Sequence, residues 1–180
     1  PPLSFGYAEG EMTTPGGFQA DGVNAISFRD PNGDAMDPVN CRGVLAVGGI
    51  SRAVGPITNF NGRRFFRALE ADVVFNNGWE DCGYYENVSN FTEVATHELG
   101  HALGLGHSAT AVFDPVLGRS GATMQPIAHF DGRVNRLHAD DKAGLTFLYP
   151  GQTLTVRRTG IGTGTVVSSP PGISCGTDCV

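Results

Sequence analysis

Residues 97–107, with the sequence HELGHALGLGH, constrain the fold of this chain more than any other feature. The first two histidines are four residues apart, so on an α-helix both lie on one face and can bind one metal ion. Gly104 can adopt the left-handed backbone that ends a helix, which would bring His107 back as a third ligand. The segment therefore predicts a helix followed by a sharp turn at Gly104.

Imidazoles and a carboxylate at these positions are the parts of a hydrolytic zinc site. Zinc bound by His97, His101 and His107 would lower the pKa of a water in its open position towards about 7. Glu98 can then take the proton of that water and pass it to a leaving amine. An HExxH pattern also occurs on surface helices that bind nothing, but here three of the chain's five histidines fall within this segment. The pattern therefore predicts one catalytic zinc ion.

This segment resembles the zinc-binding motif of the metzincin clan of endopeptidases. Ser108, after the third histidine, resembles the matrixin branch, which includes the matrix metalloproteinases. Residues 122–126, ATMQP, resemble the Met-turn of the clan, whose methionine, here Met124, lies beneath the metal without bonding it. Gln125 departs from the tyrosine that many matrixins have there. The resemblance extends over residues 23–150.

The resemblance implies an α+β fold with a twisted mixed β-sheet, an active-site helix, the Met-turn and a C-terminal helix starting near His138. It also implies a zinc-dependent endopeptidase with Glu98 as general base. Residues 43–46 resemble the substrate-binding edge strand, and residues 70–75 resemble the strand before the active-site helix. The strand and long helix that usually come first in the family are not recognisable before residue 23, so they lie outside this sequence or this branch lacks them.

The substrate is expected to be an extended protein or peptide segment that pairs with the exposed edge of a strand over residues 44–50. Residues 126–130, after the Met-turn, are expected to wall the pocket for the side chain that follows the cleaved bond. The predicted substrate-binding residues are Val44, Leu45, Ala46, Pro126 and Ile127.

The start of the motif helix leaves the role of Glu93 open. Asn90 is predicted as the N-cap, with Glu93 three residues later as its capping-box partner. Glu93 also lies one turn before His97, where an acidic pocket floor would favour a basic substrate side chain. The apolar positions that should bury this helix are Val94, Ala95, Leu99, Ala102 and Leu103.

Outside the motif, alternating apolar and polar residues predict strands over residues 23–29 and 66–75. Residues 30–37 form a loop dense in Asp and Asn, which could hold calcium or simply make turns. Residues 51–64 are predicted to be loop.

Four cysteines favour the disulfides Cys41–Cys82 and Cys175–Cys179 in a secreted, extracellular protein; the alternative is four free thiols in a cytosolic one. Residues 1–150 are predicted to be the catalytic domain, irregular over 1–22. Residues 151–180 are predicted to be β-rich, resembling the opening of repeat modules appended to secreted bacterial enzymes, or else to be a disordered linker.

The net charge of −6 argues against nucleic acid or an anionic membrane as a partner. No apolar run approaches the length of a membrane span, and the chain is expected to be a monomer. Two alternatives remain: an inactive module that binds peptides, and a domain with a structural zinc. Against them stand the intact Glu98 and the lack of an evident fourth ligand. His129 and His138 are expected to be surface or capping residues.

Overall fold

The computed structural model describes residues 16–60, 63–84, 86–150, 166–167 and 174–175. The chain divides at Pro150, and residues 6–150 form the larger of its two compact units. In the other unit, strands β6 (Val166–Val167) and β7 (Ser174–Cys175) pair antiparallel. The rest of the predicted C-terminal module and the Cys175–Cys179 pairing lie outside the described parts.

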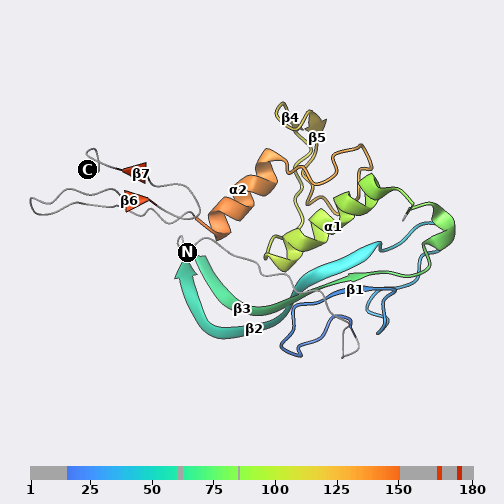
Figure 1. Cartoon of the computed structure of the whole chain (residues 1–180), viewed down its shortest axis with the longest axis horizontal. Helices are drawn as coiled ribbons and strands as arrows, with labels where there is room; N and C mark the ends of the chain where they lie inside the picture. Colours follow the sequence, from blue (N-terminus) through green and yellow to red (C-terminus); the bar gives the residue numbers. More distant parts are fainter. Residues whose placement is uncertain (1–15, 61–62, 85, 151–165, 168–173, 176–180) are drawn as a thin grey trace, which may run out of the picture. The chain divides into compact units, whose positions relative to one another are not determined.

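A three-stranded mixed sheet forms the base of the larger unit (Figure 1). Strand β1 (Ile26–Phe28) runs parallel to β3 (Arg63–Phe75), and β2 (Ala46–Phe60) pairs with β3 antiparallel on its other side. The predicted strands 23–29 and 66–75 therefore both form, the first over a shorter range. Because β3 is central, β2 is an edge strand among the parts of the chain that the structure describes, as substrate pairing requires.

The predicted loop over residues 51–64 is wrong, because β2 continues through this region to Phe60. The segment has no strict alternation and contains Pro56, and both features argue against a strand. The pairing with β3 overrides them, and its register shifts between Val54 and Thr58, on either side of the proline. A residue without an N–H is tolerated at such an irregularity in an edge strand.

Two helices lie over the sheet, α1 (Val88–Ala102) and α2 (Ala139–Leu148), and a 3-10 turn, η1 (Glu80–Cys82), precedes α1. A short hairpin of β4 (Phe113–Asp114) and β5 (Arg119–Ser120) lies between the two helices in the sequence. In the described parts of the chain, neither helix has the length and apolar character needed to cross a bilayer.

Helix α1 begins earlier than predicted, with Asn87 as its N-cap and not Asn90. The Asn87 side chain accepts hydrogen bonds from the backbone N–H groups of Ser89 and Asn90. Both asparagines suit a cap, but only Asn87 lies at the point where the backbone changes from extended to helical. Glu93 is therefore not a capping partner, and its carboxylate is free for another role.

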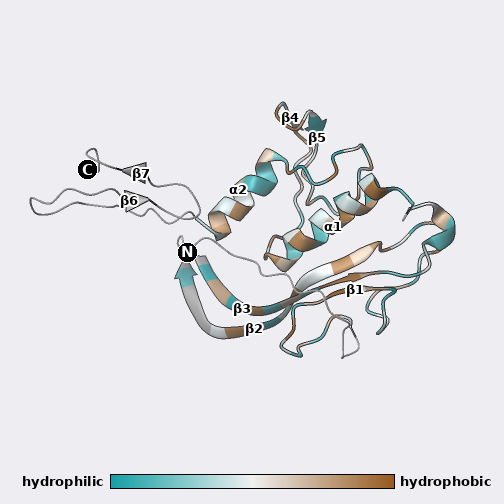
Figure 2. Cartoon of the chain, viewed as in Figure 1, coloured by the Kyte–Doolittle hydropathy of each residue, from teal (hydrophilic) through white to brown (hydrophobic). Residues whose placement is uncertain are grey.

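The core lies where α1 meets the paired ends of β2 and β3. Its buried side chains are mainly aromatic and β-branched. The ring of Phe75 contacts those of Phe28 and Phe91, with centroids 5.1 and 4.7 Å away, and the latter two rings are 6.2 Å apart. Figure 2 shows how the apolar residues concentrate on these elements. The predicted apolar stripe of α1 is wrong at Leu99, whose exposed fraction is 45%, while Val94 is buried.

A disulfide joins Cys41 to Cys82, with their Cα atoms 5.6 Å apart. It ties the segment that leads into β2 to η1, just before α1. Closing a loop of this length is worth about 3–4 kcal/mol of unfolding free energy in the chain-entropy account. The disulfide therefore holds the start of the edge strand close to the helix that carries the motif.

Candidate metal centre

The structure brings His97, His101 and His107 together at one end of a cleft. The first two project from α1 one turn apart, and the chain then turns at Gly104, which has a φ of +92°. One ring nitrogen from each histidine lies within 4.8 Å of the others. Three nitrogen donors at this separation surround a volume suited to a single ion.

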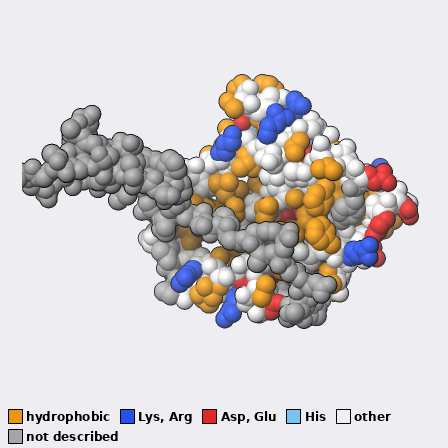
Figure 3. Space-filling view, viewed as in Figure 1, with side chains coloured by type: hydrophobic (Ala, Val, Ile, Leu, Met, Phe, Trp, Pro, Cys, Tyr) orange, Lys and Arg blue, Asp and Glu red, His pale blue; other side chains and the backbone are white. Residues whose placement is uncertain are grey.

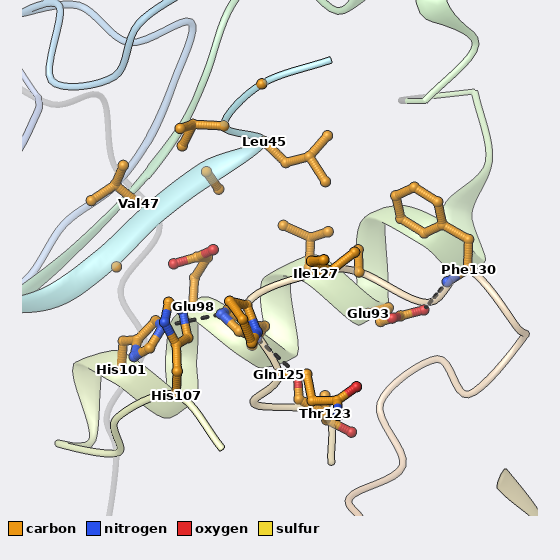
Figure 4. Close-up of a pocket in the computed structure, with 18 of the residues that line it drawn as sticks. Leu45, Val47, Glu93, Glu98, His101, His107, Thr123, Gln125, Ile127 and Phe130 are labelled. Carbon is orange, nitrogen blue, oxygen red and sulfur yellow. Dashed lines mark hydrogen bonds between the residues drawn. The ribbon is translucent and has the colours of Figure 1, made fainter. Parts of the chain in front are cut away.

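Hydrogen bonds leave the right nitrogens free for a metal. His97 Nδ1 lies 2.8 Å from the carbonyl oxygen of Thr123 (Figure 4). His101 Nδ1 lies 2.8 Å from the carbonyl oxygen of Leu105. A carbonyl only accepts, so both Nδ1 atoms carry the proton and both Nε2 atoms keep a lone pair. The two Nε2 atoms are 3.0 Å apart, an arrangement that a cation between them stabilises. The donor set fits zinc.

The surroundings of His97 and His107 favour the neutral imidazole, the form that binds a metal. Burial is the main cause that lowers the pKa of His97, and the neighbouring imidazoles lower it further against the opposing hydrogen bond to Thr123. Burial and His101 also lower the pKa of His107. Metal binding therefore need not displace protons from these two nitrogens near neutral pH.

Glu98 lies between α1 and β2 and points towards the same end of the cleft as His101 and His107 (Figure 4). It is buried, with an exposed fraction of 6%. Burial raises the pKa of its carboxyl to about 7, although the backbone N–H of Gly48 donates to it and opposes the shift. A carboxyl with that pKa can both accept and return a proton near neutral pH.

Met124 is 2% exposed, and its sulfur lies beside Gly100, in the turn of α1 between His97 and His101. Asp141 of α2 holds the turn at Met124, because its carboxylate accepts the backbone N–H groups of Thr123 and Met124 at 2.9 and 3.1 Å. Asp141 also caps α2 together with His138. The hydrogen bond from the Met124 backbone to Asp141 was not predicted, because its only signal in the sequence is an acidic residue at the start of a helix.

Replacing Gly100 by alanine should destabilise the protein by about 1–2 kcal/mol, measured by urea unfolding. A Cβ at Gly100 would overlap the sulfur of Met124, which is packed and cannot move freely. Overpacking costs about 1–3 kcal/mol, more than the roughly 1 kcal/mol gained from helix propensity. Gly106→Ala is the matched control, since nothing lies within 4 Å of its added Cβ. Equal stabilities of the two variants would contradict the expected Gly100–Met124 contact.

The cleft has a volume of about 860 Å³ and runs between the start of β2 and the segment after Met124. The middle of the face in Figure 3, where α1 lies in Figure 1, carries mainly apolar and uncharged side chains. Every residue predicted to bind substrate lines this cleft, namely Val44, Leu45, Ala46, Pro126 and Ile127.

Side chains from the core position the strand that lines the cleft. Trp79 Nε1 and Asn76 Nδ2 donate to the carbonyl oxygen of Val44 at 3.1 and 2.8 Å. Asn76 also donates to the carbonyl oxygen of Met36. The roles of Trp79 and Asn76 were not predicted, because isolated polar groups after a strand have no spacing that distinguishes them from turn residues.

Glu93 lies at the other end of the cleft from the histidines, on α1. Its carboxylate accepts the backbone N–H groups of His129 and Phe130 at 2.7 and 3.0 Å, and it is 2% exposed. Glu93 therefore holds the wall segment, residues 126–130, against the helix. This corrects the capping interpretation and leaves Glu93 little capacity to bind a basic substrate.

Among the described residues, the three histidines are the only group of side chains arranged to hold a metal ion. In the loop 30–37, the carboxylate of Asp30 accepts the backbone N–H groups of Asp34 and Ala35. These contacts match the turn interpretation of the loop and leave the calcium hypothesis without support.

The chain was compared with known proteins. A model of the family described as matrixin matches residues 25–150. Matrix metalloproteinase-19 of Homo sapiens is 39% identical over 75 residues, which is 42% of this chain and 13% of that protein. Matrix metalloproteinase-19 of Mus musculus is 44% identical over 69 residues, which is 37% of this chain and 11% of that protein. The match thus spans about an eighth of the length of these relatives. No solved structure gives a significant match.

Proposed function

This chain belongs to the matrixin family, and on that premise we propose that it is a secreted zinc-dependent endopeptidase that cleaves protein substrates. One observation carries the proposal: three histidine nitrogens converge within 4.8 Å beside the buried carboxyl of Glu98, in an open cleft. A peptide-binding module would need the cleft but neither of these features. We assign the catalytic domain to residues 1–150.

His97, His101 and His107 would hold the ion, and Met124 would form the floor beneath it. Zinc, when bound, supplies a Lewis acid that polarises the scissile carbonyl and makes a water acidic. Glu98 takes the proton of the attacking water on its carboxylate and then delivers it to the nitrogen of the departing amine. The buried position of Glu98 keeps that proton away from bulk solvent between the two transfers.

The substrate backbone would add to the free edge of β2 beside Val44, Leu45 and Ala46. Backbone N–H and C=O groups on this edge can pair with any extended peptide, so pairing alone gives little selectivity. Selectivity would come from the pocket between β2 and the wall segment, where Pro126 and Ile127 line the cleft.

Cleavage of a peptide library tests this function. We expect cleavage before apolar residues such as leucine, favoured about 10- to 100-fold in kcat/KM over glycine or arginine at the same position. The reason is that the pocket wall is apolar and the Glu93 carboxylate is already engaged by backbone N–H groups. No cleavage by the zinc-loaded chain would refute the function; a preference for arginine would refute only the pocket assignment.

Secretion would suit a chain with a disulfide, since such bonds persist in oxidising compartments. The monomeric state stays a prediction, as does the bacterial source suggested by the resemblance of residues 151–180 to modules of bacterial enzymes.

A further inference from the structure

His129 belongs to the wall segment, and its imidazole lies between two hydrogen-bond acceptors, the side chains of Glu93 and Gln125. Its Nδ1 is 3.2 Å from Glu93 Oε1 and its Nε2 is 2.7 Å from Gln125 Oε1. The orientation of the Gln125 amide is settled by its other contact, because its Nε2 donates to the carbonyl oxygen of Thr110 at 2.7 Å. A rotated amide would place two oxygens against each other there.

Both ring nitrogens of His129 therefore face oxygens that can only accept. A neutral imidazole has one N–H, so it could satisfy one of these oxygens and would present a lone pair to the other. The imidazolium has two N–H groups and satisfies both. Glu93 cannot supply the missing proton easily, since both its oxygens already accept backbone N–H groups.

The surrounding charges also suit an imidazolium. The fully buried guanidinium of Arg133 donates to Asp131 at 2.9 Å and lies 4.0 Å from Glu93 Oε1. This hydrogen bond is the main cause that lowers the pKa of Asp131, so that side chain stays a carboxylate. The carboxylates of Glu93 and Asp131 thus face one buried guanidinium, that of Arg133. A positive charge on His129 brings the net charge of these side chains to zero. Arg119, 3.8 Å from Asp131, is 40% exposed and screened by solvent.

We propose that His129 is a positioning residue for the substrate pocket, whose imidazolium ties the wall segment to Glu93 of α1 and to Gln125. The side chain does not line the cleft itself, unlike its neighbours Ala128 and Phe130. It acts through the wall, which sets how closely the pocket surrounds the side chain after the cleaved bond. This inference rests on the proposed function.

The first test uses two peptides that differ only in having leucine or glycine after the cleaved bond. His129→Gln should raise KM for the leucine peptide about fivefold over the parent, as one hydrogen bond of the tie is lost. The glycine peptide does not use the pocket, so its KM should change little. In this variant kcat should stay within about twofold of the parent.

Arg119→Gln is the matched control, because Arg119 is an exposed cation whose hydrogen bonds and ion pair are with Gly118 and Asp131, outside residues 126–130. It should retain the KM of the parent. Parental KM values for His129→Gln, or an equal change for the glycine peptide, would overturn the inference.

A second measurement does not depend on catalysis. Ring-nitrogen NMR of the full chain should show that both His129 nitrogens carry a proton and donate to Glu93 and Gln125. A ring with a single N–H would overturn the inference even if peptides are cleaved. If no peptide is cleaved, the proposed function fails and the positioning role fails with it, whereas the ring spectrum still decides whether the tie exists.

Discussion

Glu98→Gln should lower kcat about a hundredfold to ten-thousandfold while zinc still binds, because general acid–base catalysis by one residue contributes roughly 10²–10⁴. Glutamine keeps the shape and the contact with Gly48 but cannot take a proton from water. KM should change little, since the carboxyl is not part of the wall or of the strand edge. Steady-state kinetics on the leucine peptide, together with the zinc content of the purified variant, measure both effects.

The control for Glu98→Gln is the same change at Glu86, an exposed carboxylate on the loop before α1. Glu86→Gln should keep parental kcat. Stability measurements separate loss of chemistry from loss of fold. Burial raises the pKa of Glu98 from 4.5 to about 7, so the zinc-free fold loses stability as the pH rises from about 4.5 to about 7 and stays destabilised above that pH. Glu98→Gln should therefore be more stable than the parent above pH 7, with the gain vanishing at acid pH where both are neutral. Parental kcat in Glu98→Gln would refute the mechanism.

The family and the convergence of the three histidines could be predicted from the sequence because both depend on local spacing. His97 and His101 are four positions apart, which places them on one helix face whatever surrounds them, and Gly104 permits the turn by its own backbone freedom. The match to the matrixin family over residues 25–150 confirms the predicted family. The cleft residues followed from the family resemblance and not from local spacing.

The errors lie where a distant partner decides the structure. The extension of β2 to Phe60 depends on pairing with β3, which overrides the proline and the weak alternation of its own segment. Asn87 and Asn90 are equally good caps by type, and only the path of the chain out of η1 selects Asn87. Local patterns carry no information on such choices.

Glu93 shows the same limit at the candidate site. Its position one turn before His97 was compatible with a cap or an acidic pocket floor. The structure gives it a third role, because the backbone of residues 129 and 130 folds back onto its carboxylate from 36 and 37 positions away. The contacts of His129 with Glu93 and of Asp141 with the backbone at Met124 also join residues far apart in the sequence, and no periodicity of the sequence predicts them.

Removal of zinc by a chelator should abolish peptide hydrolysis, by at least about a thousandfold, because the ion contributes several kcal/mol to the transition state. The fold should survive, since the core around Phe75 and the Cys41–Cys82 disulfide lie apart from the histidines in the contacts they make. Adding zinc at about 100 times its dissociation constant should then stabilise the chain by about 2.7 kcal/mol and restore activity. Digestion of casein and thermal melting, measured on the same samples, test both statements.

His107→Ala provides the genetic equivalent of the chelator, chosen because His107 is exposed and its loss should cost little packing. The zinc-free variant should melt like the zinc-free parent, yet zinc should no longer raise its melting temperature or restore hydrolysis at the concentration that suffices for the parent. Collapse of the parent on chelation would indicate a structural metal instead. If His107→Ala hydrolysed peptides at the parental rate, His107 would not be a ligand. A zinc site with three protein ligands and one open tetrahedral position, on which a zinc-activated attack depends, would then be ruled out.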